Sequence, residues 1–260
     1  MGSGLYSVVA ASHIQEQKME IFTNNLVNSN TLGFKEDHPV FSSVLGSAMG
    51  SAMEGDKINS SKETSQVTDN ATGEVYYPVL KEIVTNFSHG DMMHTGNPLD
   101  VAIEGDGYFS VKTPDGIRYT RRGNFSKDAK DQLITQEGYP VLGKKGEIKV
   151  SGKEFSVDGN GDILIDGAKA DSFKIVDFPL PRSLKKESDL LFVPIDPNTK
   201  ESQPSDSKVS QGFLESSNVK VVKEMVYVME TMRMDEAYQK VIQSFDAIDT
   251  KAANELGRLG

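Results

Sequence analysis

The apolar residues near the beginning of the chain recur with the period of an α-helix. They fall on one line at heptad spacing, with a shorter neighbouring line, and predict a helix over residues 5–28. The first line contains Leu5, Val8, Met19, Phe22 and Leu26, and the second contains Ile14 and Ile21. Because Ser12 and Gln15 interrupt the pattern, we expect this helix to pack against another element rather than to be stable alone.

A second and stronger helical pattern covers residues 218–256 and contains no proline. It consists of two apolar lines at alternating spacings of four and three residues, separated by a phase slip. The lines are Val221, Met225, Val228 and Met232, followed by Met234, Tyr238, Val241, Phe245, Ile248 and Ala252. Apolar side chains on more than one side of a helix predict more than one packing neighbour. Packing between subunits would supply these neighbours; the alternative is that both terminal helices form the core of a monomer.

Between the helices the pattern changes twice. Residues 46–74 are polar, rich in glycine and serine, and typical of a mobile linker. From residue 76 to about residue 215, short runs of alternating character are separated by turn signals at close intervals. We therefore predict an α+β fold with an antiparallel β-rich domain inserted between the terminal helices. The expected boundaries are 1–36 for the N-terminal helix and its exit, 37–75 for a linker or extended region, 76–215 for the β-rich domain and 216–260 for the C-terminal helix.

Composition narrows the classes of partner. The chain has no cysteine, so it carries no disulfide framework, thiolate metal site or cysteine nucleophile. A net charge of -10 argues against broad phosphate binding, and nucleic acid is not an expected partner. The sequence lacks the run of about 18–20 apolar residues that a membrane span needs, and its first residues do not resemble a cleaved secretory signal.

The segment "DGNGDILIDG" resembles a calcium-binding loop only in part. Asp158, Asn160 and Asp162 occupy its first, third and fifth ligand positions. However, Ile163 and Lys169 stand where an EF-hand requires glycine and a bidentate acid. We therefore interpret the segment as the turn of a β-hairpin.

Two histidines, His89 and His94, lie close together in the sequence beside an aspartate and two methionines. Without a third imidazole or a clear carboxylate spacing, we interpret them as loop residues rather than metal ligands. The sequence also lacks a nucleophile elbow, a phosphate-binding loop and a zinc-protease helix. We predict no metal, no cofactor and no enzymatic activity.

The end of the first predicted helix carries an unusual order of residues. The stretch "NNLVNSNTLGFK" resembles the N-terminal signature of the flagellar rod and hook family of axial proteins, whose usual form is N-N-L-A-N-x-N-T-x-G-F-K. The matching residues are Asn24, Asn25, Leu26, Asn28, Asn30, Thr31, Gly33, Phe34 and Lys35, whereas Val27 stands where alanine is usual. The segments 96–111, 119–143 and 217–233 are also similar to the family, although Met234 and Asp235 replace the aromatic residue that usually follows Arg233.

The resemblance implies a structural subunit of the flagellar basal-body rod, of the proximal or the distal type, with the proximal type slightly favoured. In this family the terminal helices pair as a coiled coil around a central export channel, and the β-rich domain lies outside. The implied partners are other rod and hook-family subunits, including copies of the same chain, and the flagellar export apparatus. The implied location is the periplasmic rod, reached without a cleaved signal peptide.

Two sets of residues are expected to carry this function. The assembly motif comprises Asn24, Asn25, Leu26, Asn28, Asn30, Thr31, Gly33 and Phe34. We expect the asparagines to end the helix through bonds to the backbone, Gly33 to adopt a positive φ, and Phe34 to anchor the exit against the paired helices. The helix interface comprises Met19, Phe22, Met225, Val228, Met232, Tyr238, Val241, Phe245 and Ile248.

Two other functions fit parts of the pattern. The chain could be a secreted β-domain binding module or adhesin whose helices form an oligomerisation stalk. It could also be a glycan hydrolase that acts on the cell wall, but the acid pair that such an enzyme requires cannot be identified in the sequence.

Overall fold

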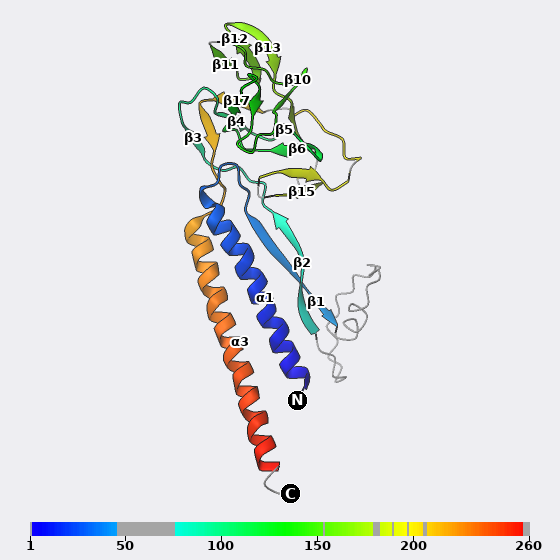
Figure 1. The fold of residues 1–260 in the computed structure, drawn as a ribbon. Helices are drawn as coiled ribbons and strands as arrows, with labels where there is room; N and C mark the ends of the chain where they lie inside the picture. Colours follow the sequence, from blue (N-terminus) through cyan, green and yellow to red (C-terminus); the bar gives the residue numbers. More distant parts are fainter. Residues whose placement is uncertain are drawn as a thin grey trace. The chain divides into compact units, whose positions relative to one another are not determined.

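The computed structural model describes residues 2–45, 76–152, 154–178, 183–188, 190–196, 198–204 and 207–256. A long helix stands near each end of the chain, and the strands between the helices pair antiparallel, which confirms the α+β class (Figure 1). The helices are α1 (Gly2–Val27), followed by the short 3-10 helix η1 (Asn28–Asn30), and α3 (Val221–Leu256). Residues 46–74, expected to form a linker, lie outside the described residues.

The chain divides into two compact units. Unit 1 is formed by Met1–Thr23, Pro39–Ile83 and Val222–Gly260, and unit 2 by Asn24–His38 and Val84–Val221. Strands β1 (Asp37–Leu45) and β2 (Tyr76–Thr85) pair with each other, and β1 lies within the region expected to be a linker or an extended segment.

Within unit 1, the two long helices run side by side in opposite directions (Figure 1). The ring of Phe22 on α1 lies 5.0 Å from that of Tyr227 on α3, measured between centroids. Farther along, the hydroxyl of Ser12 donates a hydrogen bond of 2.8 Å to the carboxylate of Asp235. No helix in the described part of the chain is long and apolar enough to cross a membrane.

Unit 2 consists of short strands. Its largest sheet has the order β14-β5-β6-β16-β15, and a three-stranded sheet has the order β11-β12-β13. The remaining strands form the pairs β3-β18, β4-β17, β7-β8 and β9-β10. The strands are β3 (Met92–His94), β4 (Val101–Glu104), β5 (Tyr108–Thr113), β6 (Gly116–Thr120), β7 (Ser126–Lys127), β8 (Leu133–Ile134), β9 (Leu142–Gly143), β10 (Gly146–Glu147), β11 (Phe155–Val157), β12 (Asp162–Ile165), β13 (Ala168–Ser172), β14 (Ile175–Val176), β15 (Leu184–Lys186), β16 (Phe192–Pro194), β17 (Lys208–Gln211) and β18 (Phe213–Glu215).

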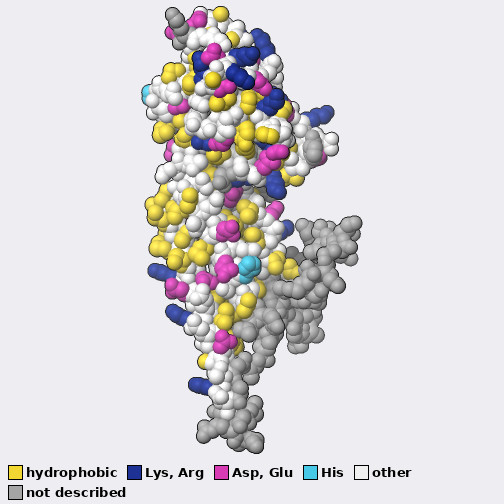
Figure 2. Space-filling model, in the orientation of Figure 1, with side chains coloured by type: hydrophobic (Ala, Val, Ile, Leu, Met, Phe, Trp, Pro, Cys, Tyr) yellow, Lys and Arg dark blue, Asp and Glu magenta, His cyan; other side chains and the backbone are white. Residues whose placement is uncertain are grey.

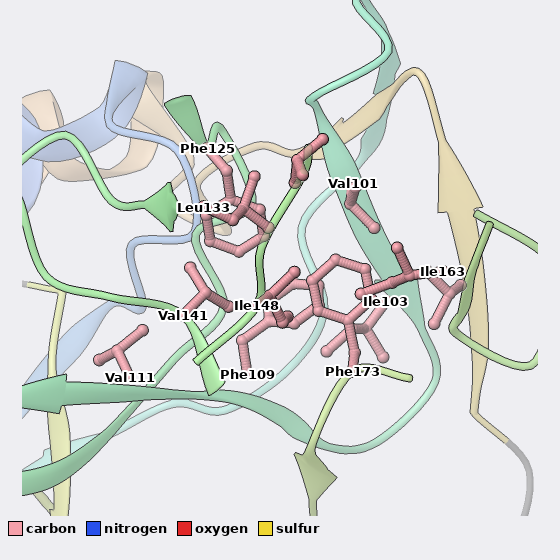
Figure 3. Close-up of a cluster of buried hydrophobic side chains, with 12 residues drawn as sticks. Val101, Ile103, Phe109, Val111, Phe125, Leu133, Val141, Ile148, Ile163 and Phe173 are labelled. Atoms are coloured by element: carbon pink, nitrogen blue, oxygen red, sulfur yellow. The ribbon is translucent and has the colours of Figure 1, made fainter. Parts of the chain in front are cut away.

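The core of unit 2 is built from β-branched and aromatic side chains of these strands. Residues from several strands and loops converge in one cluster (Figure 3), whose members include Val101, Ile103, Phe109, Val111, Phe125, Leu133, Val141, Ile148, Ile163 and Phe173. The ring of Phe109 meets those of Phe125 and Phe173 edge to face, at 5.2 and 5.4 Å between centroids. This packing holds many very short strands in one domain, because each strand alone buries too little apolar surface.

Two local interpretations of the sequence can be compared with the structure. The turn at residues 158–161 joins β11 to β12 in an antiparallel hairpin, as expected, and the backbone N–H of Asp162 bonds the carboxylate of Asp158. The interpretation of His94 as a loop residue is wrong, because His94 lies in β3 opposite Phe213 of β18. The rings of these two residues lie 4.9 Å apart between centroids, a cross-strand contact that stabilises an antiparallel pair.

Replacement of Leu133 by alanine tests the core. Leu133 is fully buried in the cluster, so Leu133→Ala should lower the free energy of unfolding by about 2–5 kcal/mol. The exposed residue Ile117 provides the control, and Ile117→Ala should change it by less than about 0.5 kcal/mol. Urea unfolding followed by near-ultraviolet circular dichroism would measure both. Equal effects of the two substitutions would contradict the assignment of this cluster as the core.

Candidate functional site

The exit from α1, residues 24–35, is held by side-chain bonds to the backbone. The amide of Asn25 donates to the carbonyl of Asp37 at 2.8 Å, and its oxygen accepts the N–H of Asp37 at 2.9 Å. This two-way bond pairs a helical residue with the first residue of β1, in the same way that one strand residue pairs with another. Asn25 is fully buried, so the bond also satisfies both polar atoms of its amide.

The next turn is built from the other asparagines and a threonine. The side chain of Asn28 donates to the carbonyl of Asn24 at 3.0 Å. The hydroxyl of Thr31 donates to the side-chain oxygen of Asn28, and the N–H of Thr31 donates to its carbonyl. Polar side chains therefore replace the helical hydrogen bonds that the chain loses as it leaves α1, as the sequence predicted.

Gly33 reverses the chain at this point. Its φ is +69°, which confirms the expected left-handed conformation. A Cβ added to Gly33 would lie 2.8 Å from the backbone nitrogen of Arg122, closer than real Cβ contacts. The N–H of Gly33 donates to the carbonyl of Glu215 at 2.9 Å. Glycine is required here both for its conformation and for the close approach of another backbone.

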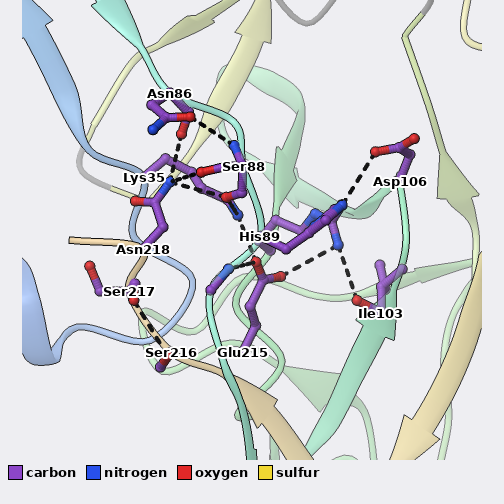
Figure 4. A network of polar contacts seen from close by, with 12 residues as sticks. Lys35, Asn86, Ser88, His89, Ile103, Asp106, Glu215, Ser216, Ser217 and Asn218 are labelled. Atoms are coloured by element: carbon purple, nitrogen blue, oxygen red, sulfur yellow. Dashed lines mark hydrogen bonds and ion pairs between the residues drawn. The ribbon is translucent and has the colours of Figure 1, made fainter. Parts of the chain in front are cut away.

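Beyond Gly33, three ionisable side chains form a buried ion network of Lys35, Glu215 and Arg121 (Figure 4 shows Lys35 and Glu215). The ammonium of Lys35 donates to one carboxylate oxygen of Glu215 at 2.6 Å, and the guanidinium of Arg121 reaches the other at 3.4 Å. All three side chains are at most 3% exposed. Burial lowers the pKa of Lys35, and the charge of Glu215 offsets part of that effect.

Backbone groups complete the buried ion network. Lys35 also donates to the carbonyl of Ser88 at 2.8 Å, and Glu215 accepts the N–H of Gly90 at 3.0 Å. Arg121 donates to the carbonyls of Ile103 and Gly105 at 3.1 and 2.7 Å. The network therefore joins five segments of unit 2: the exit of α1, the segment before β3, the end of β4 with the loop that follows it, the end of β6 and the end of β18.

Asn218 joins the same segments from the side of the chain that leads into α3 (Figure 4). Its side-chain oxygen accepts the N–H of Glu36 at 2.7 Å, and its amide donates to the carbonyls of Asn86 and Ser88. Asn218 therefore ties the segment that leaves α1 and the segment that enters α3 to the same loop, which contains Asn86 and Ser88.

Phe34 is fully buried in unit 2. The ammonium of Lys186 lies 4.0 Å from the centre of its ring and also donates to the carbonyl of Lys35 and to the carboxylate of Asp37. This cation–π contact and the two hydrogen bonds anchor the exit to β15. Packing of Phe34 against the helices stays a prediction.

One side of α3 exposes apolar side chains to solvent. Figure 2 shows hydrophobic side chains gathered over the first turns of this helix. We call this surface the apolar side of α3; its residues are Val222, Met225, Val226, Met229 and Met232, between 41% and 77% exposed. At 3.6 residues per turn they cover about 120° of the helix circumference.

A different side of α3 faces α1. Residues at a spacing of three and four lie on it, among them Glu224, Tyr227, Thr231 and Asp235. Glu224 and Thr231 are buried, and Tyr227 and Asp235 make the contacts with α1 given above. This side therefore combines polar groups with half-buried aromatic and apolar side chains, among them Tyr227, Tyr238 and Phe245.

Some of the residues expected at the helix interface are exposed and others are half-buried. Met225, Met232, Val241 and Ile248 are 41–53% exposed. Met19, Phe22, Val228, Tyr238 and Phe245 are half-buried. Among the assembly motif, Asn25, Gly33 and Phe34 are buried, and Leu26, Asn28 and Thr31 are half-buried, whereas Asn24 and Asn30 are exposed.

Sequence reasoning missed Glu215, Arg121, Asn218 and Lys186. Charged and amide side chains at these positions look like ordinary surface residues in a sequence, because their burial depends on partners up to 182 residues away. The one local signal was the lysine that follows Gly33 and Phe34 in the matched motif.

Two family models match the chain. Residues 102–165 match the flagellar hook protein FlgE/F/G D1 domain, and residues 210–255 match the flagellar basal body rod FlgEFG protein C-terminal model. The first model covers β4 to β12, and the second runs from the end of β17 through nearly all of α3.

Curated relatives match over nearly the whole chain. The flagellar basal-body rod protein FlgG of Bacillus subtilis is 31% identical over 96% of this chain and 97% of its own length. FlgG of Buchnera aphidicola (Schizaphis graminum) is 32% identical over 89% and 91%, and the rod protein FlgF of Rhizobium meliloti is 29% identical over 99% of each chain. The chain therefore belongs to the family of flagellar hook and basal-body rod proteins. The preference for the proximal type stays a prediction.

Substitution of Gly33 tests whether glycine is needed there only for its positive φ or also for the close approach of the Arg122 backbone. Gly33→Ala should lower the free energy of unfolding of unit 2 by at least about 1 kcal/mol more than Gly138→Ala does. Gly138 is the matched control because its φ is +86° but a Cβ there would meet nothing within 4 Å. Urea unfolding of both variants measures the difference. Equal losses of unfolding free energy in the two variants would mean that the close approach of Arg122 does not require glycine at position 33.

Removal of the central carboxylate tests the buried ion network. Glu215→Gln leaves Lys35 and Arg121 buried without a counter-charge and should lower the free energy of unfolding by about 3–5 kcal/mol. Glu147 pairs with Lys112 at a site open to solvent, so Glu147→Gln should cost less than about 1 kcal/mol. Thermal unfolding of both variants by calorimetry measures the contrast. A Glu215→Gln variant as stable as Glu147→Gln would contradict the importance of this network.

Proposed function

We propose that this chain is a structural subunit of the flagellar rod, which assembles through its terminal helices into a helical tube that surrounds the export channel and transmits torque. Family membership supports the role as a rod subunit. The apolar side of α3 supports assembly through the terminal helices, and it is the main observation behind the proposal.

An apolar helix surface of this extent is unfavourable in water. Five large apolar side chains lie close together on it, and the area removed from water on covering them contributes about 25 cal/mol per Å². The side of α3 that lies toward α1 is already covered, because its residues are buried or half-buried. Helices of neighbouring subunits are the occupants that fit best, because α-helices pack through apolar rows at spacings of three and four residues.

The phase slip between Met232 and Met234 separates two apolar lines on α3, and we assign a different contact to each line. Met225 and Met232 belong to the apolar line before the slip and point to the exposed side, where we place contacts between subunits. Tyr238 and Phe245 belong to the line after the slip and are half-buried, so we place them nearer the contact with α1. Coiled-coil pairing of α1 and α3, with Met19, Phe22, Val228, Val241 and Ile248 in the seams, belongs to this proposal.

The remaining parts of the proposal follow from the family. The partners are copies of this chain and other rod and hook-family subunits, and delivery takes place through the flagellar export apparatus to the periplasmic rod. We assign no catalytic role to the chain. A secreted adhesin with a helical stalk is the second candidate, because it would also cover the apolar side of α3, but in a closed oligomer instead of an open helical array.

A charge on the apolar side of α3 tests the proposal. Met229→Glu should abolish assembly of the purified chain, because the carboxylate would be buried between helices without a partner. The midpoint of thermal unfolding of unit 2 should not change. Negative-stain microscopy of concentrated protein detects assembly, and calorimetry follows unfolding.

Ile195→Glu is the matched control. It adds the same charge to an apolar side chain that is 63% exposed in unit 2, and this variant should assemble normally. Tubes formed by Met229→Glu would contradict the proposed interface, and discrete stalked oligomers of the unchanged chain would favour the adhesin.

A further inference from the structure

Three of the five residues on the apolar side of α3 are methionines. Met225, Met229 and Met232 are 48%, 51% and 49% exposed, and they follow one another at steps of four and three residues along one row of the helix. We call this row the methionine stripe. Leucine or valine would provide a similar apolar surface, but methionine alone among these residues can be oxidised reversibly.

We propose that the methionine stripe is a site of reversible oxidation by oxidants of the peroxide class, and that the sulfoxides block assembly of the subunit. This inference rests on the proposed function, since it takes the apolar side of α3 as the contact between subunits.

The chemistry needs only the side chain and the oxidant. The thioether sulfur attacks one oxygen of the peroxide, an S–O bond forms and the O–O bond breaks. The transferred oxygen loses its proton to the departing hydroxide, which leaves as water. The sulfur is oxidised by two electrons, and the peroxide is reduced by two. Methionine sulfoxide reductases reverse the change, so the modification is a switch rather than permanent damage.

Oxidation of the methionine stripe would weaken assembly because the stripe lies at the proposed contact between subunits. A sulfoxide is a strong hydrogen-bond acceptor, and its burial against an apolar helix leaves that acceptor without a partner. Other exposed methionines among the described residues react without this consequence. Met92 and Met93 are 37% and 47% exposed on β3 in unit 2, and Met234 lies about 180° around α3 from Met225.

Exposure also restricts the reaction to free subunits. In the single chain the stripe is open to solvent, whereas in an assembled tube a neighbouring helix covers it. Oxidants would therefore prevent the addition of new subunits and leave existing tubes unchanged.

The test compares assembly of the full-length chain before and after treatment with hydrogen peroxide. Peptide mass spectrometry locates the sulfoxides, and light scattering with microscopy gives the lowest concentration at which tubes form. Oxidation should raise that concentration at least about tenfold, and treatment with methionine sulfoxide reductases should restore it.

Two variants separate the stripe from other methionines. The triple variant Met225→Leu, Met229→Leu and Met232→Leu keeps the apolar surface, because leucine and methionine have similar volumes, and should assemble equally well with or without peroxide. The control Met92→Leu with Met93→Leu should lose assembly on oxidation, as the unchanged chain does. A triple variant that remains sensitive to peroxide would overturn the inference.

A measurement on the unchanged chain does not depend on these variants. Sulfoxide formation at Met225, Met229 and Met232 should be at least about tenfold slower in tubes than in free subunits. Equal rates, or tubes that form normally from oxidised chains, would overturn the inference and leave the proposed function intact. Failure of the untreated chain to form tubes would overturn both.

Discussion

The structure depends on how α3 divides its surface between polar and apolar groups. The side toward α1 buries Glu224 and Thr231 and bonds Asp235 to Ser12. The opposite side leaves methionines and valines in water. The side toward α1 also holds the half-buried Tyr227, Tyr238 and Phe245, so α3 has apolar residues on two sides and needs a second neighbour beyond α1. The exposed apolar surface thus links the fold of unit 1 to the assembly that we propose.

The buried ion network has the complementary role in unit 2. Lys35 ends the exit from α1, Glu215 ends β18 just before the segment that enters α3, and Arg121 holds the loop between β4 and β5. Loss of one partner in such a network is costly, whereas its net contribution to stability relative to an apolar core is small. Its value is geometric, because ionic and hydrogen-bonded groups accept only one arrangement.

Much of this organisation could be predicted from the sequence. Apolar periodicity and the absence of proline predicted both helices, and glycine, asparagine and aspartate predicted the reversal at Gly33 and the hairpin turn after Val157. These features depend on local backbone preferences, which a sequence expresses directly. The burial of Lys35 could not be predicted, because it depends on a carboxylate 180 residues away. The burial of Glu224 and Thr231 on α3 could not be predicted either, because helical periodicity marks the apolar residues and gives no reason to expect polar ones to be buried.

If another subunit covers the apolar side of α3, the solvent accessibility of a residue on that side must fall when the chain assembles. The chain has no cysteine, so Met229→Cys introduces a unique thiol, and Ile195→Cys provides a reference site in unit 2. The rate at which each thiol reacts with a maleimide would be measured for free and for assembled protein. We expect assembly to slow labelling at residue 229 at least about tenfold more than at residue 195. Equal labelling of residue 229 in both states would contradict it.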